Sequence, residues 1–368
     1  MYYLSNQIHL GDEIYGLKAA RFLARTVVHH IKKPTNFIEN LSLILSNDTI
    51  MKPPYEINTK ILGLITSVSE KIGEVNASFL IKSSPSLRKQ NQIKTIHSSL
   101  QIEGNTLTEQ QITAILENKR VIGPSKDIKE VQNAIKVYES IIDYKVDSIN
   151  SFLKAHKTLM EGLIDNPGAF RKEGVGIVKG SKIEHLAPPS ENVQYLMKDL
   201  FDYLKNDEEI TLIKSCVFHY EMEFIHPFTD GNGRMGRLWQ TIILMSKYPV
   251  FQYLPFETLI SKSQEDYYKV LSICDKTGKS TEFIEYMLSV VNDTLAELIG
   301  NSVSVNMTQE NRLQHFCSLK MDSFTRKDYM QVFKQLSSAS ASRDLKTGIE
   351  KGLFSKSGDK RLTTYHLK

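Results

Sequence analysis

Apolar residues recur at helical spacing along most of this 368-residue chain. Between residues 61 and 79 they lie three or four positions apart, which is typical of a helix with one buried face. A second run, over residues 92–102, ends at Gly104, and glycine commonly terminates helices. We therefore predict a mainly α-helical protein. Further helical segments are predicted over residues 108–118, 128–144, 148–163 and, with breaks, 192–299.

A segment punctuated by glycines interrupts the helical pattern. Two short β-prone stretches, Val175–Val178 and Ile183–Leu186, flank a polar turn. Such a pattern predicts a small β-hairpin over about residues 174–187.

The last 60 or so residues have a different layout. A polar junction at Gly300–Ser302 precedes three predicted helices and two short β-prone stretches around a Ser357–Asp359 turn. Three helices followed by a hairpin indicate a C-terminal winged-helix domain. The helices are predicted near residues 310–320, 326–334 and 340–351. We divide the chain into an N-terminal helical region (1–92), a central domain (93–300) and the winged-helix domain (306–368).

Composition favours a globular protein, because 41% of the residues are hydrophobic and 24% are charged. No stretch approaches the roughly 18 apolar residues that span a membrane, and the first residues lack the pattern of a secretory signal. The three cysteines lie far apart and support neither a disulfide framework nor a zinc site. We expect a cytoplasmic protein without a membrane partner. The cysteines are Cys216, Cys274 and Cys317.

The positive charge is concentrated at the C-terminus. The chain has a net charge of +4, whereas residues 306–368 alone carry +6 and the remainder −2. A basic domain of this kind can bind DNA or dock a protein. Both alternatives stay open.

The most informative stretch runs from His226 to Arg237 and reads HPFTDGNGRMGR. Pro227 should end the preceding apolar helix. Gly231 and Gly233 permit backbone angles in which successive amides point into one concavity. Another helix should begin near Arg234.

The charges in this stretch favour an anionic ligand. Arg234 and Arg237 would lie in the first turn of a helix, where the helix dipole already carries partial positive charge. Glycine amides, a helix N-terminus and two guanidinium groups together suit a polyphosphate. Asp230 could then hold a phosphate-bound Mg²⁺. His226 would be placed to take a proton from a hydroxyl group.

This stretch resembles the motif of the Fic family, His-Pro-Phe-x-Asp/Glu-Gly-Asn-Gly-Arg-x-x-Arg, at every defined position. The resemblance implies a helical Fic fold with a hairpin flap that transfers AMP from ATP to a Tyr, Thr or Ser hydroxyl of a target protein, or of the protein itself. It implies that His226 is the general base and Asp230 the Mg²⁺ ligand. The nucleotide would be bound by Gly231, Asn232, Gly233, Arg234, Met235, Gly236 and Arg237.

Two further segments match the family. The hairpin resembles the flap over the active site, whose free edge could accept a target segment as an added strand. By this resemblance Ile183 and His185 would lie near the nucleotide, while Tyr267 and Asp275 would border the adenosine.

An inhibitory pattern of the family, Ser/Thr-x-x-x-Glu-Gly/Asn, matches Ser99 to Gly104. Ser99 and Glu103 are four residues apart and would share one helix face. The resemblance implies that Glu103, at the end of an inhibitory helix over about 93–104, engages Arg237 and misaligns ATP.

Other functions stay open at this point. The chain could be a DNA-binding regulator, an ATP-binding scaffold without chemistry, or an enzyme that removes AMP or transfers another phosphate-containing group. Gly233 favours adenylylation, because Doc-type relatives that transfer phosphate carry lysine there. The sequence also leaves a homodimer open.

Overall fold

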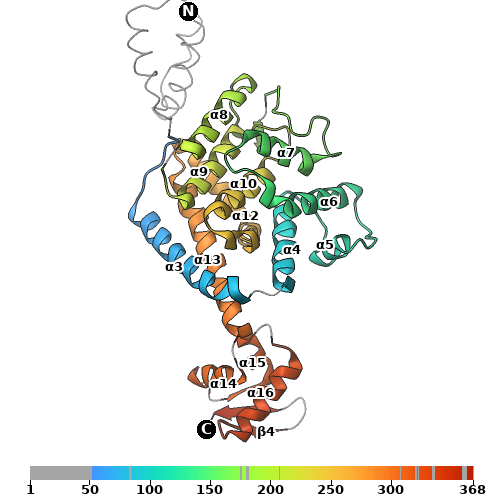
Figure 1. Cartoon of the computed structure of the whole chain (residues 1–368), viewed down its shortest axis with the longest axis vertical. Helices are drawn as coiled ribbons and strands as arrows, with labels where there is room; N and C mark the ends of the chain where they lie inside the picture. The colour runs from blue at the N-terminus through green and yellow to red at the C-terminus, as the bar shows by residue number, and fades with distance from the viewer. Residues whose placement is uncertain are drawn as a thin grey trace, which may run out of the picture. The chain divides into compact units, whose positions relative to one another are not determined.

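The computed structural model describes residues 52–82, 85–174, 176–179, 182–206, 208–306, 308–319, 321, 323–333, 336–358 and 363–367. The helical region predicted within residues 1–51 therefore lies outside the described residues. The contacts divide the chain into two compact units (Figure 1). Unit 1 comprises Met1–Ser67 and Ser84–Val291, and unit 2 comprises Val68–Ser83 and Asn292–Lys368. The domain limits drawn from the sequence remain a prediction.

Unit 1 is built from helices and one hairpin, as the hydrophobic pattern predicts. Its helices are α4 (Pro85–Ile102), α5 (Glu109–Leu116), α6 (Ser125–Glu139), α7 (Ile149–Met160), α8 (Ser190–Asn206), α9 (Thr211–Ile225), α10 (Asn232–Lys247), α11 (Glu257–Lys262) and α12 (Gln264–Thr277), with the 3₁₀ turns η1 (Ile141–Asp143) and η2 (Pro249–Tyr253). The unit division falls within α3 (Thr59–Lys82) and α13 (Thr281–Asn306).

Helices α9 and α10 form the centre of unit 1 and are buried on most of their faces, as expected of helices inside a domain. Aromatic rings fill the space beside them. The Phe152 ring lies 5.0 Å from Trp239 in an edge-on arrangement and 5.4 Å from Phe228 in a stacked one. Because Phe228 belongs to the loop between α9 and α10, this aromatic packing fixes the loop in place.

The predicted hairpin is present. Strands β1 (Gly176–Lys179) and β2 (Lys182–Leu186) pair antiparallel, with a register shift between Ile177 and Val178. A bulge of this kind bends and twists a strand.

Unit 2 contains α14 (Gln309–Ser318), β3 (Ser323–Phe324), α15 (Arg326–Val332), α16 (Ser338–Glu350), β4 (Phe354–Ser357) and β5 (Thr364–Leu367). The three strands form an antiparallel sheet in the order β3-β5-β4. Sheet and helices enclose one apolar core, whose buried members are Leu313, Phe316, Phe324, Tyr329, Phe333, Ala341, Leu345 and Phe354.

The structure differs from the sequence predictions at three places. The polar junction at Gly300–Ser302 is not a break, because α13 continues to Asn306. A helix accommodates single glycine, asparagine and serine residues at modest cost. Helix α10 begins at Asn232 rather than near Arg234. The two-residue strand β3 was not predicted, since a pattern so short carries no periodicity.

Within the described residues, no helix is long and apolar enough to cross a membrane.

Candidate active site

The loop between α9 and α10 has two residues with left-handed backbone angles. His226 ends α9 with φ of +49°, and Gly231 precedes α10 with φ of +84°. Such angles are uncommon for a residue other than glycine. Pro227 contributes to the turn at His226, because proline disfavours the helical region for the residue before it. The helix therefore ends where the sequence predicts.

Asn232 closes this loop with its side chain. Its Oδ1 accepts a hydrogen bond from the Phe228 amide, and its Nδ2 donates to the Phe228 carbonyl, both at 2.9 Å. The amide group of Asn232 therefore shapes the loop, and its predicted contact with the nucleotide stays a prediction.

Met235 and Gly236 face the protein interior. Met235 is fully buried, and its amide donates to the Gly231 carbonyl. A Cβ at Gly236 would lie 2.6 Å from His219 and 2.8 Å from Glu223, so glycine permits close packing of α10 on α9. Met235 and Gly236 therefore pack inside the protein, and their predicted contact with the nucleotide stays a prediction.

Arg237 is completely buried and is held by the segment that the family motif predicts as inhibitory. Its Nη2 donates to Glu103 Oε1 at 2.8 Å, and the Glu103 side chain is 30% exposed. Arg237 also donates from Nε to Ser99 Oγ at 3.2 Å and from Nη2 to the Ser99 carbonyl at 2.9 Å. Burial opposes the charged form, but Glu103 raises the pKa of Arg237 above its ordinary value.

The Glu103 carboxylate also lies against the N-terminus of α10. A Cβ at Gly233, the second residue of that helix, would overlap Glu103 Oε1 and lie 3.1 Å from Arg237 Nη1. Arg237 Nη1 is buried and has no hydrogen-bond partner among the described residues. A helix N-terminus attracts negative charge. The carboxylate thus occupies a site with the features of an anion-binding site.

Arg234 is buried beside this site and binds two other carboxylates. It donates to Glu130 Oε1 and to Asp230 Oδ1, each at 3.2 Å. Glu130 also accepts a hydrogen bond of 2.8 Å from Asn105, which follows the inhibitory segment. One carboxylate on α6 therefore connects Arg234 to the chain beyond Gly104.

His226 is partly buried, and its Nδ1 lies 3.4 Å from the Glu223 carbonyl. A carbonyl oxygen can only accept a hydrogen bond, so this contact favours the neutral tautomer that carries its proton on Nδ1. The lone pair is then on Nε2, the atom suited to remove a proton from a hydroxyl group.

A second histidine, His156 of α7, contacts two residues of the loop, Phe228 and Asp230. Its Nδ1 accepts from the Gly168 amide at 2.8 Å, so its neutral ring donates from Nε2 to the Asp230 carbonyl at 3.0 Å. The ring stacks on Phe228 with 3.5 Å between centroids. Burial lowers the pKa of His156 to about 4, which keeps the ring neutral near pH 7.

Of the two residues predicted to border the adenosine, Tyr267 is buried and Asp275 is half-buried. Tyr267 is only 1% exposed and its hydroxyl donates to His219 Nε2 at 3.1 Å, whereas the neighbouring Tyr268 is 45% exposed. Asp275 accepts a hydrogen bond of 3.1 Å from Tyr220. The structure therefore places Tyr267 in the core and leaves Tyr268 as the tyrosine of this pair that a ligand can reach.

Ile183 and His185 both lie in β2, opposite Val178 and Ile177. Their side chains lie outside what the structure describes. Their predicted role near the nucleotide stays a prediction.

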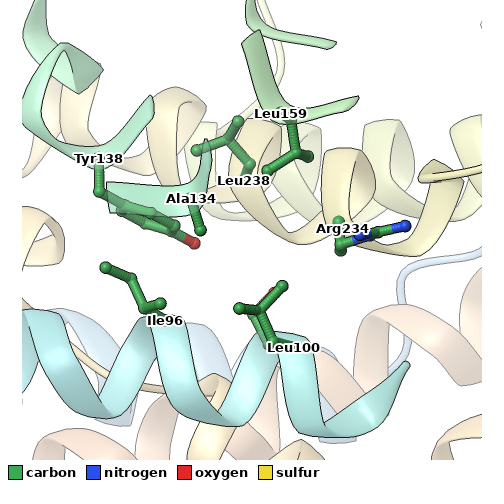
Figure 2. A pocket seen from close by; sticks show the side chains of 8 residues that line it. Ile96, Leu100, Ala134, Tyr138, Leu159, Arg234 and Leu238 are labelled. Carbon is green, nitrogen blue, oxygen red and sulfur yellow. The ribbon is translucent and has the colours of Figure 1, made fainter. Parts of the chain in front are cut away.

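A small cavity lies between α4 and the helices α6, α7 and α10 (Figure 2). Most of its lining side chains are apolar, so it does not suit a triphosphate. It indicates that α4, which carries Ser99, is incompletely packed at this point. The lining residues are Ile96, Ser99, Leu100, Ala134, Tyr138, Leu159, Arg234 and Leu238.

The segment that contains this loop matches a known protein family. Residues 147–244, which include the whole loop, match the Fic/DOC family. A crystal structure of a Fic family protein from Desulfovibrio desulfuricans G20 shares 38% sequence identity and a TM-score of 0.67, over 86% of this chain and 98% of that protein. The chain belongs to the Fic family. A Caenorhabditis elegans Fic-1 structure, at 20% identity and a TM-score of 0.56, shares the fold over 77% of this chain and 82% of that one.

Two curated relatives of this Fic protein are named as adenylyltransferases. Protein adenylyltransferase fic-1 of C. elegans is 27% identical over 66% of this chain. Protein adenylyltransferase Fic of Drosophila melanogaster is 29% identical over 56% of it. The matches cover 48% and 42% of those proteins, so the chain spans less than half of either relative.

Several residues that interact with the loop or with Arg237 carry no signal in the sequence, because they lie far from the motif. Glu130 and His156 lie in ordinary amphipathic helices, where nothing marks them as different from other polar residues. Glu257 is buried in α11; burial raises its pKa to about 8, and Arg237 opposes that rise. These residues could be recognised only after folding brought them to the loop.

Proposed function

We propose that this protein is an adenylyltransferase that moves AMP from ATP to a hydroxyl group of a protein. The observation that carries the proposal is the Glu103 carboxylate at the N-terminus of α10, bonded to Arg237. A site that holds one anion beside a helix N-terminus and two buried arginines suits the phosphates of ATP. The names of the curated relatives support the same reaction.

In this proposal His226 removes the proton from the target hydroxyl, whose oxygen then attacks the α-phosphorus. The bond between the α-phosphorus and the oxygen that bridges to the β-phosphate breaks, and pyrophosphate leaves. The backbone of Gly231 to Gly233, together with Arg234 and Arg237, stabilises the phosphate charge. Catalysis then consists mainly of positioning and electrostatic stabilisation. The target is an unidentified protein that adds a strand to the hairpin edge, or the protein itself.

Mg²⁺ is compatible with the residues present. Asp230 is half exposed, and its Oδ1 accepts hydrogen bonds from the Gly231 amide at 2.5 Å and from Arg234 at 3.2 Å. No group of three or more potential ligands gathers anywhere in the described part of the chain. A single carboxylate suits Mg²⁺ that is held mainly by phosphates and water, where the ion would neutralise phosphate charge.

The segment Ser99–Gly104 would act as an inhibitor of this reaction. Glu103 occupies Arg237 and lies against Gly233, so a phosphate can reach the same groups only after the carboxylate leaves. The inhibition proposed here is competition between two anions for one site.

The proposal is tested with ATP labelled separately on its α- and γ-phosphates. The Glu103→Gly protein, incubated with Mg²⁺ and whole-cell extract, should transfer the α-label and leave the γ-label in solution. Transfer of the γ-label would indicate phosphorylation instead, and the absence of both labels from protein would reject transfer. Release of AMP from prelabelled protein would reveal the reverse activity at the same site.

We propose that unit 2 is a winged-helix domain and that it binds DNA. Support comes from the three helices with a three-stranded sheet and from the orientation of Asp344, which is buried and bonded to Arg312 at 2.7 and 3.0 Å. Its negative charge therefore does not face solvent. The exposed residues of α16 include Arg343 and Lys346, and Lys346 pairs with Glu350 at 3.8 Å. Affinity for duplex DNA should fall steeply as the salt concentration rises. Absence of binding at low salt would reject DNA binding and favour the alternative that unit 2 docks a protein.

A further inference from the structure

Arg171, in the segment between α7 and β1, is a buried cation that the reaction proposed above does not use. It is 3% exposed. Its Nε donates to the His226 carbonyl at 2.7 Å, and its Nη2 donates to the Ile225 carbonyl at 3.3 Å. These carbonyl groups lie at the C-terminal end of α9, where they lack intrahelical partners and carry partial negative charge.

The same guanidinium contacts both ends of the hairpin. Nη1 donates to the carbonyl of Glu173, shortly before β1, at 2.8 Å. Nη2 donates to the carbonyl of Pro188, shortly after β2, at 2.5 Å. The Arg171 amide also donates to the Pro227 carbonyl at 2.9 Å. One residue therefore connects the base of the hairpin to the backbone around His226.

The chemistry of arginine suits this arrangement. Its donors lie in one rigid plane, so a single side chain can reach several carbonyl groups in fixed directions, which lysine cannot do. None of the hydrogen bonds that Arg171 makes to described residues goes to a carboxylate. Burial lowers the pKa of Arg171 below its ordinary value, while Glu191 opposes the change. A buried charge satisfied by carbonyl groups alone costs desolvation energy, which favours a role in positioning.

We infer that Arg171 is a positioning residue that sets the location of the hairpin relative to His226. The inference rests on the proposed function, in which the hairpin presents the target hydroxyl to the His226 ring. His226 has a left-handed backbone angle, and the bond from Arg171 to its carbonyl stabilises that conformation. A displacement of about 1 Å between the reacting groups can lower a rate by about 10²-fold.

The test uses the full chain with Glu103→Gly as the parent. Arg171→Gln removes the charge and most donors, Arg171→Lys keeps the charge, and Lys172→Gln removes an exposed charge next to Arg171 as the matched control. We expect Arg171→Gln to lower the transfer rate at saturating ATP by about 10²-fold with the KM for ATP within about twofold. Arg171→Lys should restore part of the rate, and Lys172→Gln should match the parent.

Hydrogen exchange of the hairpin amides gives a readout that is independent of activity. Exchange over residues 176–186 should accelerate in both Arg171 variants and remain unchanged in Lys172→Gln. The inference is overturned if Arg171→Gln has the same transfer rate and the same hydrogen exchange as the parent. It is also overturned if the KM for ATP of Arg171→Gln rises by the same factor as the rate falls. If Arg171→Gln does not fold, Arg171→Lys decides by the same criteria. If the parent itself transfers no label, the proposed function fails, and the exchange comparison still tests the link to the hairpin.

Discussion

Replacing Glu103 with glycine should increase transfer, because it removes the carboxylate that occupies Arg237. The contact is a charge-assisted hydrogen bond of 2.8 Å between a fully buried guanidinium and a carboxylate that is 30% exposed. Bonds to charged groups contribute about 1.5–3 kcal/mol, and solvent screening of Glu103 favours the lower half of that range. About 1.5–2 kcal/mol corresponds to an acceleration of roughly 10- to 30-fold at ATP concentrations below saturation.

The assay measures the initial rate at which the α-label enters protein. It compares three variants with the unsubstituted protein, which is the parent from here on. Glu103→Gln keeps a neutral hydrogen bond to Arg237 and should fall between the parent and Glu103→Gly. Gln101→Gly is the matched control, because it places glycine in the last turn of α4 without touching Arg237. Gln101 is exposed and accepts a hydrogen bond from Ser261.

Two outcomes would refute this explanation. Equal rates for the parent and Glu103→Gly would show that the ion pair does not limit ATP binding or alignment. Equal activation by Gln101→Gly and Glu103→Gly would show that the effect comes from loosening of α4. The control is needed because a cavity lies beside that helix.

Three further predictions concern the loop and the helices that support it. His226→Ala should bind ATP within about twofold of the parent and lose transfer by at least about 10²-fold, measured by ATP titration and label incorporation; a large loss of ATP affinity would contradict a role as base alone. Arg237→Ala should weaken ATP binding by about 10-fold or more while also releasing Glu103, so adding Glu103→Gly to it should give little further activation; full additivity would separate the two residues. The pKa of His156 is about 4 in the folded protein, below its ordinary value of roughly 6.5. Between these two pH values the unfolded state binds more protons than the folded state. The free energy of unfolding therefore decreases as the pH falls from about 6.5 to about 4. His156→Gln, which keeps a donor toward Asp230, should reduce by about 2 kcal/mol the loss of unfolding free energy between pH 7 and pH 5, measured by denaturant titration; an unchanged slope would reject the assignment.

The sequence predicts the part of the site that depends on neighbouring residues. The proline after His226 and the glycine at 231 determine the loop through local backbone preferences, because His226 and Gly231 have the left-handed angles. Gly233, which was expected to share that role, lies in the first turn of α10 without a left-handed angle. The spacing of Ser99 and Glu103 likewise predicts a shared helix face, and both contact Arg237. Periodicity also located the helices of unit 1, because each buries an apolar stripe.

The contributions of tertiary packing could not be predicted in this way. Within one stretch of twelve residues, Arg234 and Arg237 bind carboxylates while Met235 and Gly236 pack inward. Sequence spacing alone does not distinguish those roles, because the direction of each side chain depends on which helices surround α10. The same reason explains Tyr267, whose burial follows from its contacts with His219 and Phe283.

The position of Glu103 has a consequence for how such a protein can be regulated. Gly233 and Arg237 lie one helical turn apart on α10, so a single carboxylate contacts the helix N-terminus and the guanidinium at once. In the proposed reaction a phosphate of ATP uses both of these groups. The proposed inhibition then needs no separate site, because the carboxylate and the phosphate compete for the same groups. A partner that displaced the end of α4 by contacting the exposed Gln101 would have to break this ion pair and also the bonds of Arg237 to Ser99. Gln264 already bonds the Ile102 carbonyl at 2.8 Å, which makes the region between α4 and α12 the place where such a contact would act.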